Sequence, residues 1–158
     1  MVTLTAKDVM EKEVLAVQVH WSVDRLAAFL VENSISGAPV VSSSGKLVGV
    51  VSLTDIVRYR SLPVKNPETE GPHDYYLNGL ELQYSPHELA SFRVDSESSV
   101  TVRDIMTGII FEVNQDTKIQ QVADAMIRGR IHRVFVTRRG KLKGIITALD
   151  LLNVIRDL

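Results

Sequence analysis

Two short segments of the chain place a hydroxyl side chain three residues before an aspartate, at the start of an apolar run. They hold Ser52 and Asp55 in GKLVGVVSLTDIV, and Thr147 and Asp150 in GKLKGIITALDLL. An ionised carboxylate has two acceptor oxygens, which suit a pair of neighbouring hydroxyl groups on a ligand, and a helix that begins here offers backbone N–H groups to an anion. The same spacing is also a helix-capping box, which only stabilises the first helical turn. The sequence leaves both uses open, and they are compatible.

These two segments are parts of a longer internal repeat. Lys7-Asp8-Val9-Met10 in the first half of the chain matches Arg103-Asp104-Ile105-Met106 in the second. An apolar stripe with the spacing of an amphipathic helix follows in each copy. Its members are Val23, Leu26, Ala27, Leu30 and Val31 in the first copy, and Ile119, Val122, Ala123, Met126 and Ile127 in the second. Matches in this order indicate a duplicated unit.

Each copy predicts the same elements: an extended leading segment, a helix, a strand, a glycine hairpin, a second strand and a closing helix. In the first copy we expect the helix at 22–33, the strands at 38–41 and 47–51, and a closing helix that begins near Leu53. In the second copy these elements are expected at 118–128, 133–137, 142–146 and 148–156. A unit of about 55 residues is only marginally stable alone. We therefore predict an α/β (α+β) fold in which two repeats, each with a small sheet and packing helices, form a pseudo-two-fold pair.

The chain divides into a first repeat at 1–60, an insert at 61–99 and a second repeat at 100–158. The insert begins as a proline-containing acidic loop. Its later part, from Tyr75 to Phe92, is too apolar for a bare linker, because it holds several leucines and aromatic residues. We expect this part to dock on the core.

The composition excludes several classes of function. The chain has 158 residues, 45% of them hydrophobic and 23% charged, which is typical of a globular protein. Its net charge of −1 gives no reason to expect nucleic acid as a partner, and the absence of cysteine excludes disulfides and cysteine-ligated zinc. No signal peptide and no bilayer-spanning apolar stretch is evident, so we expect a cytoplasmic protein without membrane contact. Nucleophile-elbow, phosphate-loop and zinc-helix motifs are all missing, so we predict neither an enzyme nor a metal site.

Taken in order, and twice, the motifs resemble the cystathionine-beta-synthase (CBS) domain family, as the tandem pair called a Bateman module. The resemblance rests on the Asp-Val-Met and Asp-Ile-Met segments, the helix stripes, Gly37-Ala38-Pro39-Val40-Val41 and the two glycine-lysine segments. It implies a stand-alone regulatory module that binds AMP, ADP, ATP or S-adenosylmethionine in clefts between the repeats. Such modules usually form dimers and control another protein, so a homodimer and a separate partner are expected. The alternative is an interaction or dimerisation module that keeps the fold without effective ligand binding.

The resemblance also assigns polar contacts to the paired hydroxyl and carboxylate residues. It implies that Asp55 and Asp150 accept hydrogen bonds from ribose hydroxyls, and that Ser52 and Thr147 contact phosphate. For purine contacts it points to apolar residues and backbone of the leading segment and first strand. The matching positions are Val14, Ile35, Ala38, Ile110, Ile131 and Val134. The alternative for these six residues is ordinary core packing.

Cationic contacts are expected only in the second copy. There the resemblance places His132 and Arg133 against phosphate, Arg133 as a planar donor fork and His132 as a donor that can become charged. The matching residues of the first copy, Ser36 and Gly37, cannot supply such contacts. We therefore predict two unequal clefts and one stronger nucleotide site, although the sequence does not identify the aspartate that shares a cleft with His132. Further arginines are expected to make the surroundings of this cleft basic: Arg128, Arg130, Arg138 and Arg139. The alternative is that His132 and Arg133 lie at a solvated strand start.

Overall fold

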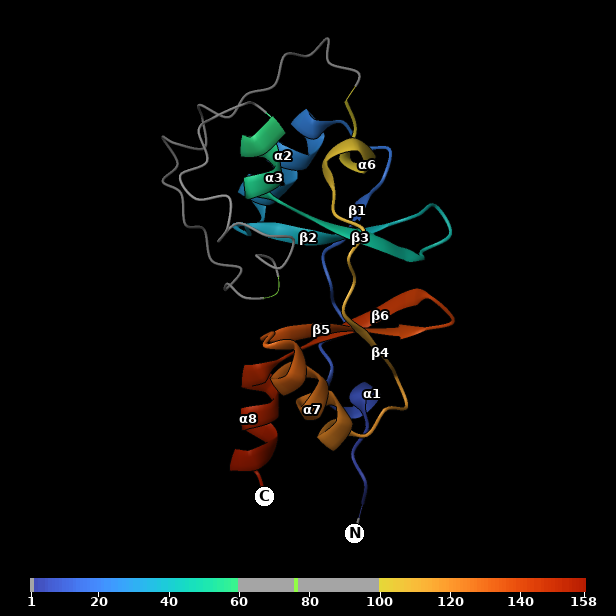
Figure 1. Ribbon diagram of the computed structural model, residues 1–158, viewed down its shortest axis with the longest axis vertical. Helices are drawn as coiled ribbons and strands as arrows, with labels where there is room; N and C mark the ends of the chain where they lie inside the picture. Colours follow the sequence, from blue (N-terminus) through green and yellow to red (C-terminus); the bar gives the residue numbers. More distant parts are fainter. Residues whose placement is uncertain (1, 60–75, 77–99) are drawn as a thin grey trace.

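Two small sheets, one from each repeat, lie between the helices of the two repeats (Figure 1). The computed structural model describes residues 2–59, 76 and 100–158. Within these residues each sheet has three strands, in the order β1-β2-β3 and β4-β5-β6. The predicted α/β fold, with a small sheet and packing helices in each repeat, is confirmed.

The first half of the chain contributes three helices and three strands among its described residues. They are α1 (Ala6–Val9), β1 (Val17–Gln18), α2 (Val23–Glu32), β2 (Gly37–Val41), β3 (Leu47–Ser52) and α3 (Leu53–Tyr59). The second half contributes α6 (Val102–Ile105), β4 (Glu112–Asn114), α7 (Ile119–Gly129), β5 (Arg133–Arg138), β6 (Lys141–Thr147) and α8 (Ala148–Arg156). The helices and hairpin strands expected from the sequence are confirmed to within one residue at each observed end.

The two sheets have the same topology. β1 runs parallel to β2, and β2 is antiparallel to β3; β4, β5 and β6 repeat this arrangement. The hairpin turns contain Gly45 and Gly140, whose φ angles of 84° and 79° lie in the left-handed region that glycine adopts without steric cost. The repeated glycine-lysine segments are therefore matching hairpins.

The amphipathic helices form for the expected reasons. The hydroxyl of Ser22 caps α2 by accepting a hydrogen bond from the Arg25 backbone N–H at 3.1 Å. Its buried face carries Val23, Leu26 and Leu30, and Val122 and Met126 bury the corresponding face of α7. None of the helices among the described residues is long and apolar enough to cross a membrane.

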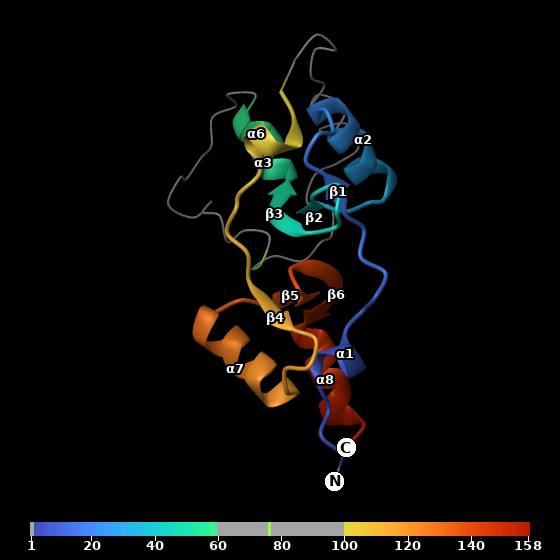
Figure 2. The same ribbon diagram turned by 90° about the vertical axis from the view of Figure 1, so that its right-hand side faces the viewer.

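The leading segments of the two repeats are exchanged. α1 belongs to the first half of the chain but packs on the second sheet, where the N–H groups of Ala6 and Lys7 donate to the carbonyls of Thr117 and Gln115 at 2.8 and 2.9 Å. Glu11 then pairs with Ile145 of β6. Figures 1 and 2 both show α1 beside the helices of the second repeat, away from the first sheet.

The second leading segment makes the reciprocal crossing. α6 lies on the first repeat, where the N–H of Val102 donates to the carbonyl of Trp21 at 2.9 Å. Thr107 and Val50 then exchange two backbone hydrogen bonds of 3.0 Å. Each repeat thus holds the segment that leads into the other.

The expectation that these leading segments are extended throughout was wrong. Ala6–Val9 and Val102–Ile105 each form one helical turn, begun by a capping box at Thr5 and Asp8 or at Thr101 and Asp104. These boxes have the same hydroxyl-x-x-aspartate spacing as the two candidate site segments, so the sequence did carry a signal for the turns.

The second glycine of each repeated segment is explained by this exchange. A Cβ atom on Gly144 would lie 2.6 Å from Met10 Sδ and 2.7 Å from the Glu11 carbonyl oxygen. One on Gly49 would lie 2.5 Å from the Thr107 carbonyl oxygen. Both glycines therefore permit the close backbone crossing of a leading segment.

The described residues form two apolar cores, each completed by the exchanged helix. Val102 of α6 is buried in the core of the first repeat, and Ala6 of α1 in that of the second. Tyr76 also lies in the second core with a fully buried side chain. The insert predicted at 61–99, with its acidic loop, lies outside the described residues except for Tyr76.

Candidate ligand-binding site

Thr147 and Asp150 form a reciprocal capping box at the start of α8, and Ser52 donates to Asp55 in the same way at the start of α3. The N–H and hydroxyl of Thr147 donate to Asp150 Oδ2 at 2.8 and 3.0 Å, and the Asp150 N–H lies 3.3 Å from the Thr147 hydroxyl. Ser52 makes the same two contacts to Asp55 Oδ2, at 2.8 and 3.2 Å. In each pair the cap uses the Oδ2 atom, which leaves Oδ1 for another interaction.

The two Oδ1 atoms differ in their surroundings. Asp55 Oδ1 lies 3.9 Å from an Arg58 guanidinium nitrogen, in a half-buried ion pair on α3. Asp150 Oδ1 has no hydrogen-bond partner among residues 2–59, 76 and 100–158. Asp150 therefore offers the more available carboxylate oxygen.

The hairpin of the second sheet places the cationic candidates beside Thr147. Arg133 at the start of β5 pairs with Thr147 at the end of β6, and directly opposed residues of an antiparallel pair share one face. The carbonyl of His132 accepts a hydrogen bond from the Ala148 N–H at 2.8 Å. The His132–Arg133 and Thr147–Asp150 segments thus meet at one end of the second sheet. In the first repeat Gly37 pairs with Ser52 at the same place, without a side-chain cation.

The two cationic residues lie in different environments. His132 is exposed, whereas Arg133 is only 5% exposed. The alternative of a solvated strand start therefore holds for His132 and is wrong for Arg133. A buried guanidinium is uncommon and is normally engaged by neighbouring groups, as it is here.

The basic surroundings expected from the sequence are only partly gathered. β5 extends between Arg133 and Arg138, so the two ends of this strand are about 17 Å apart at the usual rise per residue. The prediction that Arg138 and Arg139 surround the same cleft as Arg133 was wrong, because an extended strand carries them to the hairpin end. Arg128 forms an exposed ion pair with Asp124 at 3.0 Å.

The six apolar candidates do not form one lining. Ile131 and Val134 are buried in the second core, with Ile110 packed against it. Ala38 is buried in the first core, with Ile35 packed against it. Val14 is half-buried in the segment between Glu11 and β1. Five of the candidates thus separate into two groups, one in each core, and Val14 belongs to neither.

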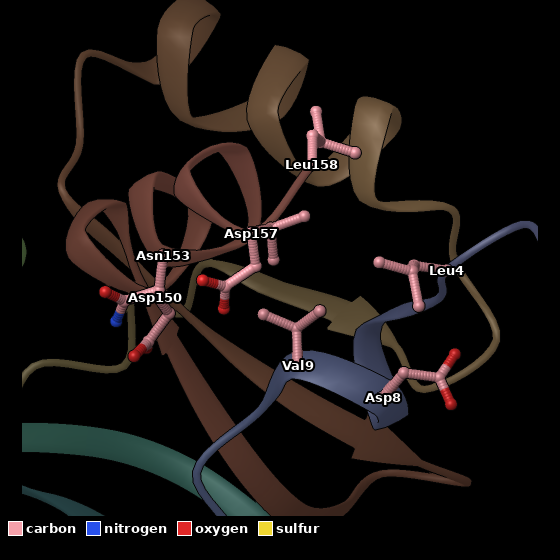
Figure 3. A pocket seen from close by; sticks show the side chains of 8 residues that line it. Leu4, Asp8, Val9, Asp150, Asn153, Asp157 and Leu158 are labelled. Atoms are coloured by element: carbon pink, nitrogen blue, oxygen red, sulfur yellow. The ribbon is translucent and has the colours of Figure 1, made fainter.

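A cavity of about 350 Å³ opens beside Asp150 (Figure 3). Its walls come from both halves of the chain, with Leu4, Asp8 and Val9 on one side and α8 with the residues after it on the other. The second wall holds Asp150, Asn153, Val154, Asp157 and Leu158. This volume lies within the usual range of small-molecule sites, at about 300–1,000 Å³.

Three carboxylates give the cavity its chemistry. Asp8 accepts hydrogen bonds from the N–H and hydroxyl of Thr5, which hold the pKa of its carboxyl below the ordinary value. Asp157 is paired with Arg156 at 2.8 Å. Acceptor oxygens of this kind suit hydroxyl donors and repel phosphate, so a phosphorylated ligand would direct its phosphate elsewhere.

Sequence reasoning missed Asp8 and Asn153 as cavity residues, because the exchange of α1 brings Asp8 to α8.

The family of the protein follows from its sequence and its repeated architecture. The model of the CBS domain family matches residues 6–62 and 102–157. The chain belongs to the CBS domain family. This CBS pair is 31% identical over 153 residues to uncharacterized protein MJ1426 of Methanocaldococcus jannaschii, with 94% of this chain and 89% of that one covered. It is 28% identical over 127 residues to the chloroplastic CBS domain-containing protein CBSX1 of Arabidopsis thaliana, and this match spans 52% of that protein and 80% of the chain.

Solved CBS structures share the fold of this pair. CBSX2 in complex with AMP superposes with a TM-score of 0.65 at 24% identity, covering 98% of this chain and 97% of that one. The CBS domain pair of MJ0100, in complex with 5-methylthioadenosine and S-adenosyl-L-methionine, gives 0.61 at 20% identity and covers 98% of both chains. A CBS protein of unknown function from Kribbella flavida gives 0.68 at 21% identity, covering 97% and 99%. At these identities the likeness establishes the fold.

Proposed function

We propose that this CBS pair is a regulatory module that binds an adenosine-containing ligand at Asp150 and thereby controls a separate protein. The observation that carries the proposal is the position of Asp150: its Oδ2 is used by the helix cap, while its side chain lines a cavity built from both halves of the chain. The remaining oxygen suits a ribose hydroxyl donor. The family membership and the adenosine ligands of MJ0100 and CBSX2 support this choice of ligand class.

Arg133 is the residue proposed to favour a phosphorylated ligand. It lies opposite Thr147 in the β5–β6 ladder, one turn of helix from the Asp150 carboxylate. A ribose on Asp150 and a phosphate on Arg133 would keep phosphate away from the three carboxylates of the cavity. AMP, ADP and ATP would then use both groups, whereas S-adenosylmethionine would use Asp150 alone.

The composition of the cavity walls supports the proposed regulatory role. Leu4, Asp8 and Val9 precede the first sheet in the chain, and Asp150 and Asn153 follow the second. A ligand between them would favour one relative packing of α1 and α8. It would change what a partner protein recognises only through its different affinity for the two arrangements.

A non-catalytic interaction role is the second candidate, and an exposed apolar face favours it. Four large apolar residues on α7 and α8 are between 57 and 75% exposed: Ile127, Leu149, Leu152 and Ile155. The positions of the first repeat that match Leu149 and Leu152 are Thr54 and Val57, which are half-buried. We infer that a second copy of the chain packs on this face. In a dimer with a two-fold axis, the apolar face of one copy packs against the same face of the other, so both are buried together.

A thermal-shift screen tests the ligand class. AMP, ADP, ATP, S-adenosylmethionine and NAD are each added to the protein, and a ligand that binds the native state raises the melting temperature. We expect at least one adenosine-containing compound to do so. If none does, the interaction module without effective ligand binding is the better description.

A further inference from the structure

The side chain of Tyr76 is fully buried in the second repeat, although the residue comes from the segment between the repeats. Its ring packs edge-on against Phe111, with ring centroids 4.7 Å apart, and against Phe135 at 6.1 Å. Its hydroxyl donates to the Ile109 carbonyl at 3.0 Å and accepts from the Phe111 N–H at 3.2 Å. A flat ring with a donor and an acceptor at its edge is therefore held in an apolar slot.

This slot coincides with one group of the residues expected to contact a purine. Ile109 and Phe111 flank Ile110, and the backbone carbonyl of Tyr76 accepts from the N–H of His132 at 2.9 Å, next to Ile131. Ile110, Ile131 and Val134 all pack in the same core cluster as Tyr76. A purine would use the same features: apolar walls for its faces, and a backbone carbonyl and N–H for its edge.

The exchange of leading segments indicates to which aspartate the slot belongs. Thr107 pairs with Val50, two residues before Ser52, and the chain then runs on through Ile110. In the other half, Glu11 pairs with Ile145, two residues before Thr147, and the chain runs on through Val14. Ile110 therefore belongs to the side of Asp55, and Val14 to the side of Asp150.

We propose that Tyr76 occupies the purine position of the cleft on the Asp55 side, so that this CBS pair takes its ligand only on the Asp150 side. Tyr76 is then a specificity-determining residue, which sets the number of ligands per chain and selects between two related clefts. This inference rests on the proposed adenosine site for its account of the open cleft. The ion pair between Asp55 and Arg58 fits the same asymmetry, because it engages the Asp55 carboxylate without a ligand.

The number of AMP molecules bound per chain tests the inference. Calorimetry with AMP is expected to give one site for the natural chain and two for Tyr76→Ala, in which the ring and hydroxyl are gone. Tyr76→Phe keeps the ring and is expected to retain one site. In Tyr76→Ala, the further change Asp55→Ala should remove the added site. A folded Tyr76→Ala protein that still binds one AMP would overturn the inference.

Free adenine separates this inference from the proposed function. If the natural chain binds no AMP, adenine that raises the melting temperature of Tyr76→Ala, and not that of the natural chain, still supports a purine slot under Tyr76. If adenine has no such effect while p-cresol, the tyrosine side chain itself, does, the slot is specific for tyrosine and the inference is wrong. If Tyr76→Ala does not fold, Tyr76→Leu, which keeps apolar bulk, replaces it in the calorimetry with AMP and in the melting-temperature measurement with adenine.

Discussion

Glu11 and Ile145 exchange two backbone hydrogen bonds, of 2.9 and 3.0 Å, although they lie near opposite ends of the chain. Thr107 and Val50 make the reciprocal pair. Because of these two crossings, neither repeat is complete without a segment of the other. The exchange also places Asp8 opposite Asp150 across the candidate cavity.

Gly144→Ala tests the crossing at Glu11. The added Cβ would meet Met10 Sδ and the Glu11 carbonyl oxygen at 2.6 and 2.7 Å, so the leading segment must shift. We expect a loss of about 1–3 kcal/mol in the free energy of unfolding, measured with urea. Gly108→Ala is the matched control, because a Cβ there meets nothing within 4 Å. Equal stability of the two variants would contradict the importance of this close approach.

The acid dependence of stability tests the capping box of α1. Hydrogen bonds from Thr5 hold the pKa of Asp8 below its ordinary value of 3.8 in the folded protein. A depressed folded pKa adds stability above the unfolded pKa, and this stability is lost as the pH falls through the folded pKa. Melting temperatures from pH 6 to pH 2 should therefore converge between the natural chain and Asp8→Asn. Glu13→Gln, which alters an exposed carboxyl nearby, should show the same dependence of melting temperature on pH as the natural chain. If the melting temperatures of Asp8→Asn and of the natural chain differ by a constant amount from pH 6 to pH 2, the role given to Asp8 is wrong.

Arg133→Met tests the proposed phosphate contact. Loss of a charge-assisted hydrogen bond is expected to weaken AMP binding by about 10- to 100-fold. Adenosine binding should change little, because adenosine has no phosphate. Arg138→Met, at the exposed far end of β5, is the control and should leave both affinities unchanged. If AMP and adenosine weaken equally in Arg133→Met, this residue acts through packing of the core.

Leu152→Asp tests the proposed contact between copies. Light scattering after size exclusion should show a dimer for the natural chain and a monomer for the variant, because the change introduces charge into the apolar stripe of α8. Leu15→Asp alters an apolar residue of comparable exposure, 46% against 57%, away from α7 and α8. It should remain a dimer. A natural chain that is monomeric at high concentration would exclude this interface.

Local patterns were enough to predict most of the elements. Val23, Leu26 and Leu30 specify the buried face of α2 by their helical spacing, whereas Val31, at the end of the predicted stripe, is 42% exposed. The glycine turns at Gly45 and Gly140 specify the hairpins. The crossings at Glu11 and Thr107 could not be predicted in this way, because they pair segments that are distant in sequence. Gly49 and Gly144 are the indirect sign of these crossings in the sequence. The structure explains both glycines, because a Cβ atom at either position would clash with the backbone of a leading segment.

The candidate site was predictable in its residue types and less so in its spatial grouping. The capping geometry of Thr147 and Asp150 follows directly from their spacing. Arg138 is near Arg133 in sequence and far from it in space, because β5 is extended. The position of Tyr76 depends on tertiary contacts with Phe111 and Phe135, which leave no periodic signal in its own segment.

The most direct test of the ligand site is calorimetry with AMP and S-adenosylmethionine on the natural chain, Asp150→Ala and Asp104→Ala. Both variants lose a capping box, at a cost of about 0.5–2 kcal/mol in stability, but only Asp150 lines the cavity. We predict that at least one ligand binds the natural chain and Asp104→Ala with similar affinity and does not bind Asp150→Ala. No heat with either ligand on the natural chain, or unchanged binding by Asp150→Ala, would contradict the proposed site.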